Sequence, residues 1–198
     1  MINASNIMKQ PPRTWTHNTL GAFEFSGVWT GTVHVPGFNA FRYDPGYKDV
    51  GPPTGVYELR FEAADEQDVP SETAISLALN VLQNQASLVS AVCDALWEDF
   101  NGRGPDSGMW WHRGRSEFED DETFPEGAED FLRLMRLSGI EVRKNANGYN
   151  APVAELCFWA EFEQEHNVGV LTDGEVILGT GYQWDVSVFN SYRASAKN

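Results

Sequence analysis

Residues 153–182, VAELCFWAEFEQEHNVGVLTDGEVILGTGY, decide the kind of fold that this chain can form. In its first part, side chains of one kind recur at every second position, which is the spacing of a β-strand. One side of that strand carries Ala154, Leu156, Phe158, Ala160 and Phe162, and the other side carries Glu155, Cys157, Trp159 and Glu161. Further along, Asp173 and Gly174 predict a two-residue type I′ turn that joins VGVLT to EVILGTG as a hairpin. Because these strands are apolar on both faces, we expect them in the middle of a sheet or beneath helices.

The polar corner before this hairpin, Glu163-Gln164-Glu165-His166, is a candidate site. Glu165 and His166 are candidates for general acid and base catalysis, since histidine exchanges protons near neutrality. Adjacent residues of a strand point to opposite faces, however, so adjacency alone does not make the two a working pair. Three interpretations stay open: a catalytic site, a binding site, or a structural corner in which His166 and Asn167 cap a turn.

Three further strands are predicted upstream, at 20–25 (LGAFEF), 28–35 (VWTGTVHV) and 56–63 (VYELRFEA). Between the last two, residues 36–55 are rich in Pro and Gly and predict a long loop. Phe41, Tyr43 and Tyr47 are the side chains that would anchor this loop on the core.

Two helices are predicted after these strands. Ser71 is a good N-cap, and apolar residues then recur at steps of three and four: Ile75, Leu79, Leu82, Ala86, Val89, Cys93, Leu96 and Phe100. This stripe is one helix or two helices broken near Asn84, and Gly102 ends it. A second, shorter helix is predicted with Phe131, Leu134 and Leu137 on its inner face and Gly139 as its stop.

These elements predict a single α+β domain over residues 1–198, built on an antiparallel sheet with one long and one shorter helix packed on a face. The length of 198 residues suits one core, and an aromatic content of 13% is typical of a folded chain. We expect residues 1–17 to form a flexible tail and residues 102–125 a long loop.

The net charge of the chain limits the classes of partner that it can bind. Fourteen Lys and Arg stand against 29 Asp and Glu, for a net charge of −15, so the field of the whole molecule opposes binding to nucleic acid or to an anionic membrane. A basic protein partner is favoured instead, although such a charge can also serve solubility alone. Cys93 and Cys157 suit two buried free thiols in a reducing compartment, and no stretch has signal-peptide or membrane-spanning character. We therefore expect a cytoplasmic protein.

The segment MWWHRGRSEFEDDE, residues 109–122, is the second candidate site. Trp and Arg are enriched as anchors of protein interfaces, and a dense acidic run follows them. The predicted binding residues are Trp110, Trp111, His112, Arg113, Glu119, Asp120 and Asp121. The alternative is that Trp110 and Trp111 fold back onto the core.

Neither a metal site nor a cofactor is predicted. The four histidines stand at 17, 34, 112 and 166, without the spacing of zinc or calcium ligands. The chain has no Gly-rich phosphate loop between a strand and a helix, and no nucleophile motif.

The C-terminal third resembles the end of an uncharacterised bacterial domain-of-unknown-function family, in which a Cys- and Trp-bearing strand runs into a W-x-x-E-H-G-L-type turn and a D-G hairpin. The matching positions are Cys157, Trp159, Glu165, His166, Gly169, Asp173, Gly174, Gly181, Tyr182 and Asp185. Asn167 stands where the family has Gly, and Trp159 and Glu165 are further apart than in the family. Because Asn tolerates positive φ better than other non-glycine residues, the first difference favours a structural turn.

The resemblance implies no known activity. Small acidic bacterial domains of this kind include immunity proteins that neutralise toxins, which is an analogy of class. We therefore expect a non-enzymatic, acidic protein-interaction domain, immunity-like by this analogy, that binds a basic partner. The alternative is a small hydrolase-type enzyme that uses the Glu165 and His166 corner.

Overall fold

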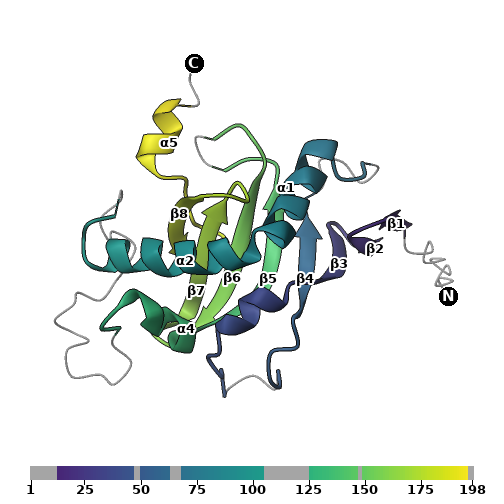
Figure 1. Ribbon diagram of the computed structural model, residues 1–198. Coiled ribbons are helices and arrows are strands. Elements are labelled where there is room, and N and C mark those ends of the chain that lie inside the picture. Colours follow the sequence, from purple (N-terminus) through teal and green to yellow (C-terminus); the bar gives the residue numbers. More distant parts are fainter. Residues whose placement is uncertain (1–12, 47–49, 63–67, 105–124, 147–148, 196–198) are drawn as a thin grey trace, which may run out of the picture.

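A computed structural model describes residues 13–46, 50–62, 68–104, 125–146 and 149–195 of the chain. Its centre is a sheet of eight strands whose spatial order is the order of the sequence (Figure 1). The strands are β1 (Arg13–His17), β2 (Gly21–Phe25), β3 (Trp29–His34), β4 (Val56–Phe61), β5 (Met135–Arg143), β6 (Val153–Ala160), β7 (Glu163–Thr172) and β8 (Ile177–Tyr182). Neighbouring strands are antiparallel except β4 and β5, which are parallel. The sheet is therefore mixed.

The helices are short beside this sheet. They are α1 (Glu72–Gln83), α2 (Gln85–Phe100), α4 (Phe131–Leu134) and α5 (Asn190–Ser195), with 3₁₀ helices η1 (Pro36–Ala40) and η2 (Ala128–Asp130). The chain passes through α1 and α2 between β4 and β5, and such a crossover is what a parallel pair of strands requires.

The predicted fold class is wrong, because the fold is dominated by a mixed eight-stranded sheet and not by helices packed on an antiparallel one. The predicted shorter helix accounts for part of this error. Only Phe131–Leu134 is helical, and β5 begins at Met135, so Leu137 and Gly139 lie in a strand. β5 hydrogen-bonds to β4 on one side and to β6 on the other, and this pairing overrides the local spacing of apolar residues.

The long helical stripe is two helices that meet at Asn84. The predicted cap is confirmed, since Ser71 Oγ accepts a hydrogen bond from the Ala74 amide at 3.2 Å, and Gly102 ends the second helix with φ of 68°. The Asn84 side chain donates to the carbonyl of Gly174 at 2.8 Å and so fixes the break over the β7–β8 turn. The buried face differs from the predicted stripe, which it shares only at Cys93 and Leu96: α1 buries Leu77, Ala78 and Val81, and α2 buries Leu88, Val92, Cys93, Leu96 and Asp99.

The β7–β8 turn differs from the predicted type I′ turn. Four residues, 173–176, connect the strands, and Gly174 alone among them has positive φ, of 94°. Asp173 Oδ1 accepts hydrogen bonds from the amides of Glu175 and Val176 at 3.0 and 2.9 Å. The predicted hairpin is thus confirmed, but the predicted type I′ turn is not. Hydrogen bonds to the Asp173 side chain stabilise the longer connection.

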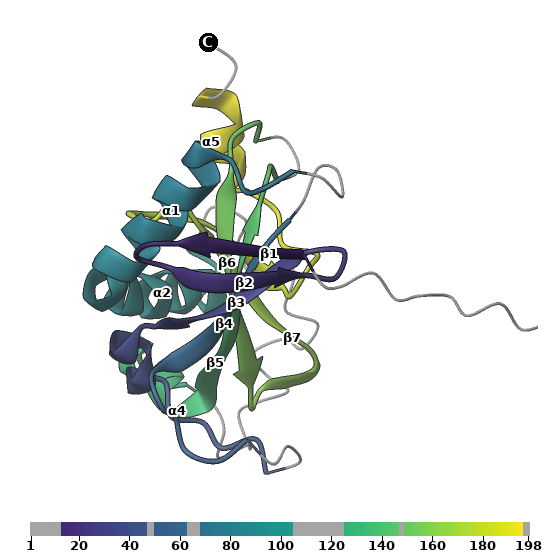
Figure 2. The same ribbon diagram turned by 90° about the vertical axis from the view of Figure 1, so that its right-hand side faces the viewer.

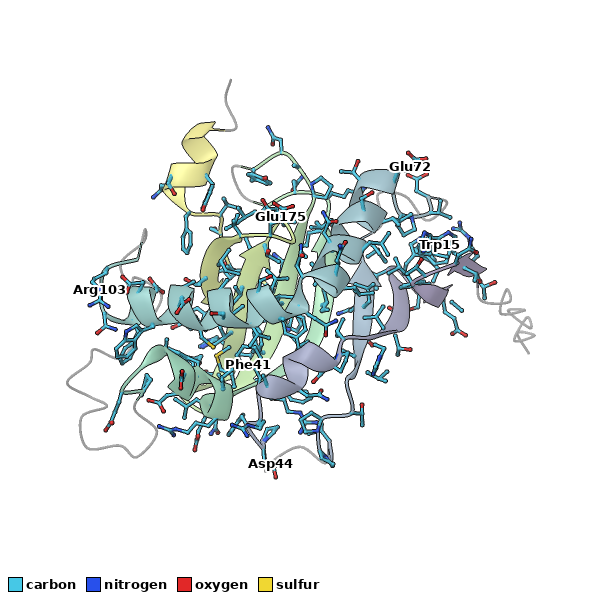
Figure 3. All side chains as sticks on the ribbon, in the orientation of Figure 1. Trp15, Phe41, Asp44, Glu72, Arg103 and Glu175 are labelled. Carbon is cyan, nitrogen blue, oxygen red and sulfur yellow. The ribbon has the colours of Figure 1, made fainter. Side chains whose placement is uncertain are left out.

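The main core lies between the sheet and the helices. Figure 2 shows α1, α2 and α4 on one side of the sheet. The core there contains the predicted strand side chains, among them Trp29, Leu59 and Phe158, and the loop anchor Phe41, each at most 1% exposed. Figure 3 places Phe41 in the middle of the molecule, with Trp15 of β1 and Arg103 after α2 at opposite ends. Tyr43 is buried as predicted, and Tyr47 lies outside the described residues.

Residues 13–17 form a strand and so are not part of the expected tail. The remaining residues of that tail, 1–12, and residues 105–124 of the expected loop lie outside the described chain.

Candidate functional site

The side of the sheet away from α1 and α2 carries a row of charged residues, and we call it the open face. Arg60 of β4, Glu141 of β5 and Glu155 of β6 are direct neighbours across three strands. Residues directly opposite each other in a sheet share a face, so these three side chains project on the same side. The next row contains Glu58, Gly139, Cys157 and Gly169, again from neighbouring strands.

Small residues in this second row leave a hollow in the open face. It has a volume of about 240 Å³, and its walls include Glu58, Arg60, Glu141, Trp159 and Trp184. Gly139 and Cys157 line it as well, along with Asn167 and Gln183. A second groove, of about 680 Å³, shares Glu58 and Arg60 with the hollow and continues past Glu24 toward the β1–β2 hairpin. The open face is thus indented from β7 to β1.

Charge in the hollow is mixed and slightly acidic. Arg60 Nε lies 3.6 Å from Glu58 Oε1, and their side chains are 38% and 51% exposed. Glu141 adds a second carboxylate beside Arg60. An exposed pair of this kind contributes little to stability, so both partners remain available to a ligand.

Glu155 is a fully buried carboxylate next to the hollow. It forms an ion pair with Arg143, and its Oε1 accepts a hydrogen bond from the Trp184 amide at 2.8 Å. Burial raises the pKa of Glu155 to about 7, and the charge of Glu141 adds to the rise, while Arg143 and the Trp184 amide lower it. Glu155 therefore joins β5, β6 and the segment after β8 through one side chain.

That segment, residues 183–189, lies against β7 and β8 on the open face because glycines leave room for it. A Cβ atom at Gly169 would come within 2.5 Å of Glu155 Oε1 and 3.1 Å of the Gln183 Cα. A Cβ at Gly179 would come within 2.2 Å of the Ser187 carbonyl oxygen. Val186 and Val188 then form a small second core with Val153 and Leu171.

Trp184 is the most exposed large apolar side chain on this segment, at 63%. Its φ of 68° is unusual for a residue other than glycine. The hydrogen bond from its amide to Glu155 holds this backbone conformation, and the residue lines the hollow. An exposed tryptophan on a fixed backbone is typical of a binding anchor.

The predicted corner is arranged differently from the pair proposed for it. His166 Nδ1 lies 3.1 Å from Glu163 Oε1, which also accepts from the His166 amide at 3.1 Å, and the imidazole lies 4.7 Å from the Tyr182 ring. Glu165 is exposed, as is His166. Asn167 has φ of 59°, so the positive φ expected there is confirmed, but Asn167 and the predicted corner lie within β7 and not in a turn. Catalysis by Glu165 and His166 stays a prediction.

The second predicted site, from Trp110 to Asp121, lies outside the described residues. Both cysteines are buried and free, as predicted. Burial raises the pKa of the Cys157 thiol well above its ordinary value, with the charges of Glu155 and Glu141 adding to the rise, so this thiol is a poor nucleophile although it lines the hollow. Within the described ranges, no three His, Cys, Asp or Glu side chains are grouped as metal ligands, and no described helix is long and apolar enough to cross a membrane.

Sequence reasoning missed Glu155, Arg143 and Trp184 as a unit. One signal was present, since Glu155 interrupts an otherwise apolar strand and a charge in such a place needs a partner. The partners themselves were not visible, because Arg143 and Trp184 are joined to Glu155 only by the pairing of β5 with β6 and by the return of the chain after β8.

Residues 19–187 match the model of one protein family, described as "Domain of unknown function (DUF6985)". The match covers most of the chain, so the chain belongs to this family, and the resemblance to a domain-of-unknown-function family is confirmed at that level. No curated protein matches the chain. No solved structure matches it either.

Proposed function

We propose that this DUF6985 member is a non-enzymatic protein-interaction domain of the bacterial cytoplasm, immunity-like in character, that binds a basic protein partner. The observation that carries the proposal is the excess of 29 acidic over 14 basic residues together with an indented face on which Glu24, Glu58 and Glu141 outnumber Arg60. The same charge disfavours nucleic acid and anionic membranes as partners.

The physical argument rests on where charge acts in binding. Complementary charge raises the rate of encounter, and an aromatic anchor slows dissociation. The open face offers both, because carboxylates line its grooves and Trp184 stands beside them. A partner with a basic surface would be attracted from a distance and then held at the indole.

Capture of partners from the native host, followed by binding kinetics at several salt concentrations, tests this proposal. We expect a basic protein whose association slows as salt is added, since salt screens charges over about 10 Å at 0.1 M. Recovery of an acidic or neutral partner, or an association rate indifferent to salt, would overturn it.

The segment from Trp110 to Asp121 is a second part of the proposal and rests on sequence alone. Replacing Glu117, Glu119, Asp120, Asp121 and Glu122 with Gln or Asn is expected to cut the association rate and flatten its salt dependence. Trp111→Ala is expected to speed dissociation instead. An unchanged association rate in the first variant would remove the segment from the interface.

One contact favours the enzymatic alternative, namely the 3.1 Å approach of Glu163 Oε1 to His166 Nδ1, which would orient the imidazole as a base. Screening of ester and amide substrates with the wild type and with His166→Ala tests it. Turnover that is lost in the variant would support a hydrolase, and turnover equal in both proteins would exclude this corner.

A further inference from the structure

We infer that the hollow in the open face is a subsite for one arginine side chain of the partner, whose guanidinium lies between the Trp184 indole and the carboxylates of Glu58 and Glu141. The inference rests on the proposed function and names the chemistry that this part of the surface recognises.

The size of the hollow favours a single side chain. Its volume of about 240 Å³ is below the roughly 300–1,000 Å³ of pockets that hold whole small-molecule ligands. The larger groove of about 680 Å³, which shares Glu58 and Arg60 with the hollow, has room for the neighbouring residues of an extended peptide. One residue of such a peptide would enter the hollow while the rest follows the groove toward Glu24.

An arginine side chain, that of Arg60, already lines the hollow. Arg60 Nε lies 3.6 Å from Glu58 Oε1 within it. Because both side chains are more than a third exposed, this pair is weak and can be exchanged for another at little cost. An incoming arginine would also meet Glu141, which stands beside Arg60 on the neighbouring strand. Arginine matches a carboxylate with two parallel hydrogen bonds, which lysine cannot do.

Two indoles complete the subsite. Trp159 and Trp184 both line the hollow, and a cation over an indole face gains attraction from the ring. The backbone of Trp184 is already held by its amide hydrogen bond to Glu155, which reduces the cost of ordering it on binding. Arginine is the cation most often found against tryptophan, which agrees with the charge argument.

The experiment uses the full chain and two small probes, N-acetyl-arginine methylamide and N-acetyl-citrulline methylamide, which differ in the charge of the terminal group. Each is titrated at low salt while the tryptophan indole NMR signals are followed, with the Trp184 signal assigned from Trp184→Phe. We expect the arginine probe to shift the Trp184 indole in a saturable way, and the citrulline probe to bind about tenfold more weakly.

Two variants with opposite expected effects on the affinity for the arginine probe extend the test. Glu141→Gln is expected to weaken the arginine probe about threefold, whereas Arg60→Gln, which removes the resident guanidinium, is expected to tighten it by a similar factor. Glu175→Gln removes the same charge from the exposed β7–β8 turn and is the matched control, with no expected change. If Arg60 instead only supports the walls of the hollow, Arg60→Gln should weaken binding of the arginine probe.

The inference is overturned if the Trp184 signal does not respond, if both probes bind equally, or if Arg60→Gln weakens binding. Its failure is distinguishable from that of the proposed function. A captured basic partner whose salt-dependent binding survives Trp184→Ala and Glu141→Gln would reject the subsite alone. A responsive hollow without any basic partner would reject the protein-binding function and leave the subsite standing.

Discussion

The two faces of the sheet differ in the side chains that they carry. On the face covered by α1 and α2, side chains such as Trp29 and Phe158 are apolar and fully packed. On the open face, the alternate positions of the same strands carry Arg60, Glu141 and Glu155. The first face stabilises the fold, and the second holds a buried ion pair, a hollow and an exposed indole, which are costly features for stability alone. The open face is therefore where function is to be sought.

The largest effect is expected on the covered face. Phe158 is fully buried and its ring lies 4.9 Å from that of Phe41, so Phe158→Ala should lower the free energy of unfolding by about 3–5 kcal/mol. Denaturant unfolding measures the loss. A cost below about 1 kcal/mol would show that this face is less tightly packed than its burial indicates.

A smaller effect is expected from Glu155 and depends on pH. Its pKa is raised from 4.5 to about 7 in the folded protein, so the folded state binds the extra proton between these values. The stability from this group is therefore fully present below pH 4.5, is lost as pH rises through about 7, and amounts to about 3 kcal/mol.

The measurement is the free energy of unfolding of the wild type minus that of Glu155→Gln, followed from pH 4.5 to pH 8. This difference should decline with rising pH, while the difference between the wild type and Glu175→Gln should stay nearly flat. If this difference declined with falling pH instead, the charge of Arg143 would outweigh burial in setting the pKa of Glu155.

Two glycines of one row provide a matched pair. Gly169→Ala places a methyl group 2.5 Å from Glu155 Oε1, so it should cost about 1–3 kcal/mol, whereas at Gly139 the nearest atom is 3.5 Å away and alanine should be nearly neutral. Thermal unfolding of both variants checks this difference. Equal costs would show that residues 183–189 do not press on β7 as described.

The smallest effect on stability is expected at Trp184. Its side chain is 63% exposed, so Trp184→Ala should change the free energy of unfolding by no more than about 0.5 kcal/mol. Binding of the partner should weaken in the same variant, because the anchor is lost. A large loss of stability would place Trp184 among the structural side chains.

Local features of this fold could be predicted from the sequence. The alternation around Phe158, the cap at Ser71 and the positive φ of Asn167 each depend on a few neighbouring residues, and each is confirmed. The parallel pairing of β4 with β5 could not be predicted, because it joins segments more than 70 residues apart. For the same reason the first part of β5, up to Gly139, was predicted as part of a helix, since its strand character comes from its two neighbours in the sheet.

The candidate site was less accessible to prediction than the fold. The conspicuous corner at Glu165 and His166 could be found from residue types alone, whereas the hollow depends on the register that sets Gly139 beside Cys157. Trp184 could not be assigned to it, because the chain must turn back after β8 before the Trp184 amide reaches Glu155.

Hydroxyl-radical footprinting of tryptophan side chains, with and without the captured partner, tests most directly whether the open face is the binding face. We expect Trp184 and Trp159, which line the hollow, to become protected in the complex. Trp97 of α2, on the covered side of the sheet, should be oxidised at the same rate in both samples. Protection of Trp97 with unchanged oxidation of Trp184 would show that the partner binds the helices and not the open face.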